Sequence, residues 1–416
     1  MNEPKLRFKA DSETPFPDWE KSKFSDVFDN INNSTFSRDC LNYVDGNVKY
    51  IHYGDILTTF DSTVNAEASN VPYVNKDINC QKYQLLADGD IIVADTAEDD
   101  TVGKSVEITN TSNVKLISGL HTIACRPKLK FASGYLGYYM NSNPYHNQLR
   151  PYMQGIKVTS ISKANIALTN VSIPSLPEQQ KIASLFTELD NLIQSAEKEL
   201  EGYRELKQGM LQKMFPKKGE KVPEIRFPEF TDDWEQHKLG ELGEISTGST
   251  PSTSNSAYYS EDGIPWVTPT DINELTISDT PRKLSEEGAK VGRIVPANTI
   301  LCTCIASIGK NTLLTVKGSF NQQINSLTPN AENDAYFLLT ESELWSNKMK
   351  RMAASGTMQI VNKTEFSNLE TLVPSTAEQK KIGSYFRNLD NLIALQQKEL
   401  DGYKELKKGL LQQMFC

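Results

Sequence analysis

The feature of this sequence that most constrains its fold is an internal repeat with an offset of 200 residues. Residues 177–215 and residues 377–415 are identical at 24 of 39 positions, and most of the differences are conservative. The segments that precede them repeat only faintly, for example where Trp19 returns as Trp234. Self-similarity at a fixed period indicates a duplicated architecture. We therefore expect two globular segments that share a frame and differ in content, each followed by nearly the same helix.

The repeated segments have the sequence pattern of long helices. Ser175 with Glu178, and Ser375 with Glu378, match the capping box that begins many helices. Apolar residues then recur at alternating steps of four and three, which is the heptad pattern of a coiled coil. Each helix would be about 60 Å long. The expected boundaries are a globular domain at 1–174, a helix at 175–216, a second globular domain at 217–374 and a second helix at 375–416.

An isolated helix with this pattern would expose its apolar stripe to water. We therefore expect the two helices to form an antiparallel intramolecular coiled coil, which separates two heads related by pseudo-twofold symmetry. Lys207 and Lys407 interrupt the stripe at the same position. They either fix the register, as polar residues in such seams often do, or extend to solvent. In the second copy the stripe includes Ile382, Phe386, Leu389 and Ile393.

Four glycines lie inside the predicted helices, where each costs about 1 kcal/mol relative to alanine. They lie on a flank of the helices that also carries leucines. We expect this second apolar edge to dock another protein, with the glycines allowing close approach. The alternative is that the edge packs against the protein's own globular domains. The residues of this edge are Gly202, Gly209, Gly402, Gly409, Leu185, Leu192 and Leu206.

The globular segments have the patterns of a mixed α+β fold. Short apolar runs rich in β-branched residues indicate strands, and two longer segments indicate helices. The predicted strands are residues 89–94, 166–173, 299–305 and 366–373, and the predicted helices are residues 135–140 and 336–351.

The distribution of charge matters more here than its sum. A net charge of −9 argues against indiscriminate binding to nucleic acid. Three stretches, however, contain no Asp or Glu and supply Lys and Arg together with aromatic and amide side chains. They are residues 108–177, 288–331 and 344–364. Such groups suit phosphate contact and base-edge readout, so we predict a DNA-binding face on each head. The alternative is that these stretches contain only buried strands and solvated lysines.

The predicted DNA-binding residues come from these stretches and from two loops, residues 155–157 and 356–359, that occupy matching places in the repeat. They are Lys128, Lys130, Arg150, Tyr152, Gln154, Lys157 and Lys163 in the first head, and Lys310, Gln322, Lys348, Lys350, Arg351, Gln359 and Lys363 in the second.

No catalytic motif is complete in this sequence. Gly103-Lys104-Ser105 resembles the end of a phosphate-binding loop, but Glu98 stands where that motif needs glycine. Asn143-Pro144-Tyr145 lacks one proline of the loop that holds the target adenine in amino-methyltransferases, and no glycine-rich cofactor loop precedes it. The six cysteines and four histidines do not cluster as zinc ligands do. We predict a reader of DNA with no catalytic residue, metal or cofactor of its own.

Two further features predict a cytoplasmic protein. The cysteines are scattered, so reduced thiols are expected. No apolar run approaches the ~18 residues typical of a membrane span, and the first residues lack the layout of a secretory signal.

The pattern as a whole resembles the specificity (S) subunits of type I restriction-modification systems, and the resemblance covers the entire chain. Its most specific parts are the sequences PEQQKIA at 177–183 and LDNLI at 189–193, their counterparts at 377–383 and 389–393, and the Trp-Glu pairs that open each half. One departure is Ala377, where the first copy has proline, and this matters little at the start of a helix.

The resemblance implies a function and partners. Each head would be a target recognition domain that reads one half of an asymmetric bipartite DNA site. The helices would set the spacing and dock two modification subunits, which carry S-adenosylmethionine and methylate adenine. Added restriction subunits would use ATP and Mg²⁺ to translocate and cleave DNA.

Two other functions are weighed against this one. A stand-alone DNA methyltransferase or nuclease would bind S-adenosylmethionine or cleave DNA with a metal, and the missing motifs argue against it. A coiled-coil scaffold with protein-binding heads would show no sequence-selective affinity for DNA, and it leaves the duplicated acid-free stretches unexplained.

Overall fold

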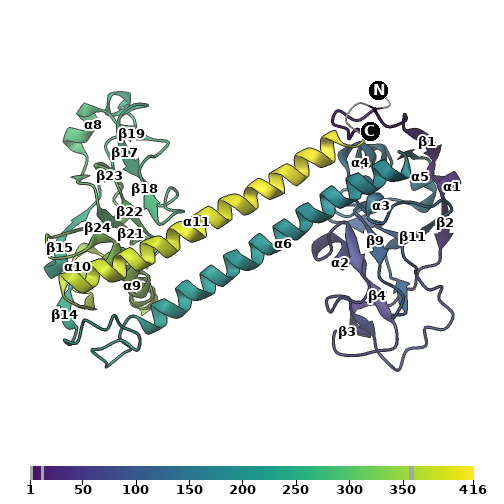
Figure 1. Ribbon diagram of the computed structural model, residues 1–416. Helices are drawn as coiled ribbons and strands as arrows, with labels where there is room; N and C mark the ends of the chain where they lie inside the picture. Colours follow the sequence, from purple (N-terminus) through teal and green to yellow (C-terminus); the bar gives the residue numbers. More distant parts are fainter. Residues whose placement is uncertain (1–2, 11–13, 356–359) are drawn as a thin grey trace. The chain divides into compact units, whose positions relative to one another are not determined.

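The computed structural model describes residues 3–10, 14–355 and 360–416 (Figure 1). The chain forms two compact units. Unit 1 comprises Met1–Glu197 with Lys398–Cys416, and unit 2 comprises Lys198–Gln397. Each unit contains one globular head and parts of both long helices, α6 (Leu176–Lys213) and α11 (Thr376–Gln413).

The head of unit 1 is built on a mixed five-stranded sheet with the order β2-β11-β7-β9-β5. All its pairings are antiparallel except β5 with β9. A smaller four-stranded sheet, β10-β4-β6-β3, lies beside it in the head. The strands of the larger sheet are β2 (Phe28–Ile31), β11 (Thr122–Pro127), β7 (Ile91–Ala94), β9 (Ser105–Thr109) and β5 (Thr63–Asn65), and those of the smaller are β10 (Leu116–Ser118), β4 (Lys49–Ile51), β6 (Tyr73–Val74) and β3 (Leu41–Asn42).

Short helices and two strand pairs complete this head. The strand β1 (Glu20–Lys23) pairs with β13 (Asn170–Ile173), and β8 (Thr96–Ala97) pairs with β12 (Thr159–Ser160). The helices are α1 (Phe24–Val27), α2 (Tyr53–Thr58), α3 (Tyr135–Met140), α4 (Asn143–Leu149) and α5 (Lys163–Ile166), with short 3₁₀ turns at Arg38–Cys40 and Arg150–Tyr152.

The head of unit 2 repeats the topology of the larger sheet with different residues. Its five-stranded sheet has the order β15-β24-β21-β22-β18, and again only the pairing at one edge, β18 with β22, is parallel. The strands are β15 (Gly243–Thr247), β24 (Ile324–Pro329), β21 (Thr299–Thr303), β22 (Asn311–Leu314) and β18 (Thr276–Ile277).

The second sheet of unit 2 has the order β16-β19-β17-β23-β20, and β14 pairs with β25 as β1 does with β13. These strands are β16 (Tyr259–Ser260), β19 (Lys283–Leu284), β17 (Ile264–Val267), β23 (Gly318–Phe320), β20 (Ile294–Val295), β14 (Glu235–Lys238) and β25 (Glu370–Val373). The helices are α7 (Leu239–Leu242), α8 (Glu286–Val291), α9 (Ala335–Ser355) and α10 (Lys363–Ser367), with a 3₁₀ turn at Ser256–Tyr258.

In each unit the two long helices run antiparallel, as predicted. In unit 1, Lys404 pairs with Glu197 at 2.7 Å and Lys407 pairs with Asp190 at 2.5 Å. Later residues of α11 therefore contact earlier residues of α6. In unit 2, Arg204 Nη2 donates to Gln397 Oε1 at 3.0 Å and Lys207 pairs with Asp390 at 2.9 Å, which gives the same direction.

The heptad stripe is buried where the helices meet the heads. In unit 1, Phe186 stacks on Phe415, and both lie in the head's core with Trp19. In unit 2, Phe386 and Phe215 take the same places beside Trp234. Each head therefore closes its core with one aromatic side chain from near the start of one helix copy and one from just beyond the end of the other.

The predicted capping boxes are wrong for both glutamate side chains, whereas the Ser375 hydroxyl accepts a hydrogen bond from the Glu378 backbone N–H at 3.5 Å, as predicted. The Glu178 carboxylate accepts hydrogen bonds from Arg7 at 2.8 and 3.0 Å, and Glu378 accepts two from Arg226 at 2.8 Å. Both carboxylates are almost fully buried. A guanidinium offers a buried carboxylate two charge-assisted bonds, where the capping box offers one backbone N–H. These glutamates therefore fasten the start of each helix to the segment that precedes its head.

The two strands predicted at the centres of the larger sheets are confirmed, whereas the two predicted directly before the long helices are only partly strand. Residues 89–94 and 299–305 contain β7 and β21, and residues 135–140 and 336–351 are helical, as predicted. Residues 166–173 and 366–373 are only half strand, because α5 and α10 extend into their first residues. Ser162 and Asn362 cap these short helices by accepting from the backbone N–H groups of Asn165 and Glu365. Among the described residues, no helix is both long and apolar enough to cross a membrane.

Candidate DNA interface

Three loops meet at one end of the five-stranded sheet in unit 2. The loop after β21 is tied to the loop before β24, because Cys304 N donates to Gln323 O at 2.8 Å. The segment before α10 joins them, because Val361 N donates to Cys304 O at 3.0 Å. We call residues 304–310, 321–323 and 360–361 the loop end of unit 2.

The same arrangement occurs in unit 1. Asp95 N donates to His121 O at 3.1 Å, and Ile161 N donates to Asp95 O at 2.9 Å. Asp95 follows β7 and His121 precedes β11, so the backbone pattern matches that of unit 2 position by position. We call residues 95–104, 119–121 and 153–161 the loop end of unit 1. The two loop ends share a backbone frame and differ in nearly every side chain.

The loop end of unit 2 carries polar side chains suited to reading base edges. Lys310 and Gln322 are exposed, and the Gln322 side chain accepts a hydrogen bond from the Thr250 hydroxyl. Ser249 lies close by in the chain, and its hydroxyl accepts from the backbone N–H of Arg293 at 2.7 Å. Amide, hydroxyl and cationic groups are the side chains that contact bases and phosphates in protein–DNA complexes.

The loop end of unit 1 is chemically different. The His121 side chain is 47% exposed, lies 3.4 Å from Asp95, and packs edge-on against Tyr53. His121 has a positive φ of 54°, which holds the residue in the left-handed region. Lys157 and Ile156 are exposed on the neighbouring loop. The same surface also carries exposed Glu98, Asp99 and Asp100.

The structure gathers some of the predicted DNA-binding residues and separates others. In unit 1, Gln154 and Lys157 belong to the loop end, and Arg150 precedes it in a 3₁₀ turn. Lys128 and Lys130 follow β11, whose opposite end enters the loop end, so they lie at the far end of the sheet. The Lys128 amine is also occupied, because it lies 3.4 Å from Asp29 and donates to Ser25 O.

The remaining predicted residues lie as follows. Tyr152 is half-buried against the core of unit 1, Lys163 is the exposed first residue of α5, and Lys363 is its exposed counterpart on α10. On α9, Lys348 donates to the backbone carbonyl of Glu370, whereas Lys350 and Arg351 are exposed. Gln359 and the loop 356–359 lie outside the described residues.

The predicted docking edge is exposed in both units. Leu192 and Leu406 in unit 1 are 47% and 51% exposed, and Leu206 and Leu392 in unit 2 are 42% and 44% exposed. A Cβ added at Gly202, Gly209, Gly402 or Gly409 would meet no atom within 4 Å in the described part of the chain. The alternative, that this edge packs on the protein's own heads, is therefore wrong for the glycines. By contrast, Leu185 is half-buried, Ile393 is half-buried, and Ile382, Phe386 and Leu389 are buried in the helix seam or the core of unit 2.

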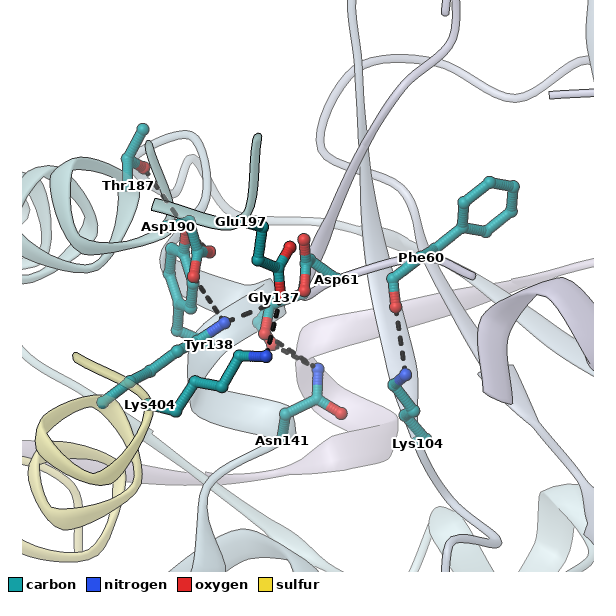
Figure 2. Close-up of polar contacts among 12 residues, drawn as sticks. Phe60, Asp61, Lys104, Gly137, Tyr138, Asn141, Thr187, Asp190, Glu197 and Lys404 are labelled. Atoms are coloured by element: carbon teal, nitrogen blue, oxygen red, sulfur yellow. Dashed lines mark hydrogen bonds and ion pairs between the residues drawn. The ribbon is translucent and has the colours of Figure 1, made fainter. Parts of the chain in front are cut away.

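The phosphate-loop resemblance at Gly103-Lys104-Ser105 has no phosphate site behind it. The Lys104 amine donates to the backbone carbonyls of Leu57 and Phe60, and Figure 2 shows it directed at Phe60. Burial lowers the pKa of Lys104. This lysine holds α2 against the sheet and is not free to bind a phosphate.

Comparisons with known proteins decide the family. The family model for the type I restriction modification DNA specificity domain matches residues 17–202 and 231–403. The chain belongs to this family. It is 24% identical over 407 residues to the putative type I restriction enzyme MjaX specificity subunit of Methanocaldococcus jannaschii, covering 95% of this chain and 92% of that protein. It is 34% identical over 171 residues to the type I restriction enzyme HindI specificity subunit of Haemophilus influenzae, covering 38% and 37% of the two chains.

Solved structures share the fold. The S subunit of a type I restriction-modification system from M. genitalium matches with a TM-score of 0.64 and 14% identity, covering 100% of this chain and 99% of that chain. The prediction of a type I specificity subunit is therefore confirmed, as is the prediction that the chain recognises DNA and is not itself an enzyme. The two alternative functions, a stand-alone enzyme and a protein-binding scaffold, do not fit this family.

For this specificity subunit, the structure adds His121 and Thr250 as candidate DNA-contacting residues that the sequence did not single out. His121 lies within the acid-free stretch 108–177, but the prediction there rests on Lys, Arg, Tyr and Gln side chains, and Thr250 lies outside all three acid-free stretches. One signal was available for His121: it stands immediately before a strand at the place where Gln323 stands in the second half. That correspondence is visible only once β11 and β24 are known to be equivalent.

Proposed function

We propose that this specificity subunit reads an asymmetric bipartite DNA site, with residues 1–174 reading one half and residues 217–374 the other. The observation that carries the proposal is the shared backbone frame of the two loop ends. Identical hydrogen-bond patterns present His121 and Asp95 in one head, and Gln323 and Cys304 in the other. A common frame with different side chains suits one mode of DNA approach with two sequence preferences.

We further propose that the exposed leucine and glycine faces of the long helices hold two modification subunits, one on each unit. Exposed apolar side chains beside open glycines offer a surface on which another helix can approach closely. The adenine methylation and its S-adenosylmethionine would belong to those subunits, and restriction subunits with ATP and Mg²⁺ would join the same assembly. Residues 175–216 and 375–416 would set the distance between the half-sites.

The experiment that tests this function is a selection of bound duplexes. The chain, assembled with its modification subunits, is incubated with a pool of random double-stranded DNA, and the retained duplexes are sequenced. We expect two unlike short motifs separated by a fixed number of unspecified base pairs. A single continuous motif, or retention without any sequence enrichment, would contradict the proposal.

A further inference from the structure

A cluster of polar side chains joins the head of unit 1 to both long helices. Asp190 of α6 pairs with Lys407 of α11 at 2.5 Å, and its second oxygen accepts a hydrogen bond from the Tyr138 hydroxyl at 2.8 Å. Tyr138 belongs to α3 of the head, and its ring stacks on Phe186 with centroids 4.9 Å apart. Asp61 of the head lies 4.0 Å from the Lys407 amine, and Figure 2 shows Tyr138 beside Asp190. We call Tyr138, Asp190, Lys407 and Asp61 the polar joint of unit 1.

Unit 2 contains the same joint with the helices exchanged. Asp390 of α11 pairs with Lys207 of α6 at 2.9 Å and accepts from the Tyr336 hydroxyl at 3.0 Å. Tyr336 belongs to α9 of this head, and Glu343 of the same helix pairs with Lys207 at 2.7 Å. We call these four residues the polar joint of unit 2. In both units a lysine of one helix, an aspartate of the other and a tyrosine of the head meet.

The joints show that the two seam lysines fix geometry. The Lys207 and Lys407 side chains are only 14% and 17% exposed, so the suggestion that they extend to solvent is wrong. Burial alone would lower the pKa of Lys207, but Glu343 and Asp390 outweigh it and raise this pKa. Both lysines are ion-paired with acidic partners that only one register of the helices supplies.

The tyrosine hydroxyls have a separate role from the ion pairs. The ion pair between Lys407 and Asp190 joins helix to helix, whereas the Tyr138 hydroxyl joins the head to that pair. The heads diverge almost completely in sequence, yet both place a tyrosine hydroxyl on the repeated aspartate. A hydrogen bond to a charged acceptor is directional, so it restricts rotation of the head about the helices in a way that the stacked ring does not.

We infer that Tyr138 and Tyr336 are positioning residues that set the angle of each head on its helix pair, and so determine which separation between half-sites is accepted. The inference rests on the proposed bipartite reading. The two tyrosines contact no DNA in this account. They act through Asp190 and Asp390, which the seam lysines hold in place.

The test compares spacer preference in the assembled complex with modification subunits. Methylation rates are measured on duplexes that carry the selected half-sites at the native spacing and at one base pair more and less. In the variant Tyr138→Phe with Tyr336→Phe we expect the preference for native spacing to fall by roughly fivefold or more, since both bonds to a charged acceptor are lost. The rate at native spacing should change less than this preference does.

A matched control removes hydroxyls that bond only inside the heads. The Tyr145 hydroxyl lies 3.1 Å from that of Thr169, and the Tyr259 hydroxyl donates to Pro251 O at 2.7 Å. The variant Tyr145→Phe with Tyr259→Phe should keep the wild-type spacer preference, even where its melting temperature falls. An equal loss of preference in this control would overturn the inference, because general loosening of the heads would then explain the effect.

Spacer discrimination by the wild-type complex separates failure of the inference from failure of the proposed function. If the wild-type complex discriminates spacers and the Tyr138 and Tyr336 variant discriminates equally well, the inference is overturned and the proposed function stands. If the wild-type complex methylates without regard to spacing, the proposed function and the inference fall together. Should the double variant not assemble, Tyr138→Phe and Tyr336→Phe are compared singly, and each should show part of the loss of preference.

Discussion

Replacing Gly202 and Gly402 with arginine is expected to stabilise the isolated chain and to abolish its assembly with modification subunits. Both positions are interior to long helices, where glycine costs about 1 kcal/mol relative to a good helix former such as arginine. An added Cβ would meet no atom within 4 Å among the described residues, so the larger side chain is free of clashes in the chain alone. In the complex it would stand between the helix and its partner.

The substitutions should raise the stability of the chain and at the same time abolish its assembly, so a general loss of folding cannot explain the expected result. Thermal unfolding should show a melting temperature equal to or above that of the wild type, while size-exclusion chromatography with modification subunits should show no complex. The control is Gln208→Arg with Lys408→Arg, which places arginine at equivalent exposed positions about 100° around each helix from the neighbouring glycine. Complex formation that survives the glycine substitutions would show that modification subunits dock elsewhere.

Neutralising the basic residues around the loop end of unit 1 is expected to weaken DNA binding strongly and to make it less sensitive to salt. The variant is Arg150→Gln, Lys157→Gln and Lys163→Gln in the assembled complex. All three side chains are exposed, and no ion pair within the described part of the chain engages them. Each lost phosphate contact reduces the slope of log affinity against log salt by about 0.9, so the slope should fall by roughly two to three.

The location of the charges decides the control for this variant. Lys128→Gln with Lys130→Gln removes two charges from the same head at the opposite end of the sheet. We expect this change to leave the slope within about 0.5 of the wild-type value, less than one phosphate contact contributes. If the slope falls equally in both variants, DNA contacts both ends of the sheet. If it falls only in the control, the loop end of unit 1 does not contact DNA and the proposal is contradicted.

The parts of the fold that follow local rules could be predicted from the sequence. The heptad spacing from Ile182 to Met214 identified both long helices, and exposure of their apolar stripe required that they pack together. The lysines in the seam were recognised as polar interruptions, but their partners were not, because Glu343 lies 136 residues from Lys207 and belongs to a head whose fold was unknown.

The parts that depend on contacts between distant segments could not be predicted. Glu178 matched a capping box within four residues, yet its carboxylate binds Arg7, which is 171 residues away. Likewise, charge alone grouped Lys128 with Lys157, and only the antiparallel register of β7 with β11 shows that they lie at opposite ends of a sheet. The proposal that His121 contacts DNA depends on the same register.

The central claim is that two different heads, held on a duplicated pair of helices, each read one half of a DNA site. Its most direct test is a map of methylated adenine in cells with and without this gene. We predict that one motif loses its methylation when the gene is deleted, and that this motif consists of two unlike halves around an unspecified spacer of constant length. An unchanged map in cells that express the modification subunit, or the loss of a continuous or palindromic motif, would contradict the account.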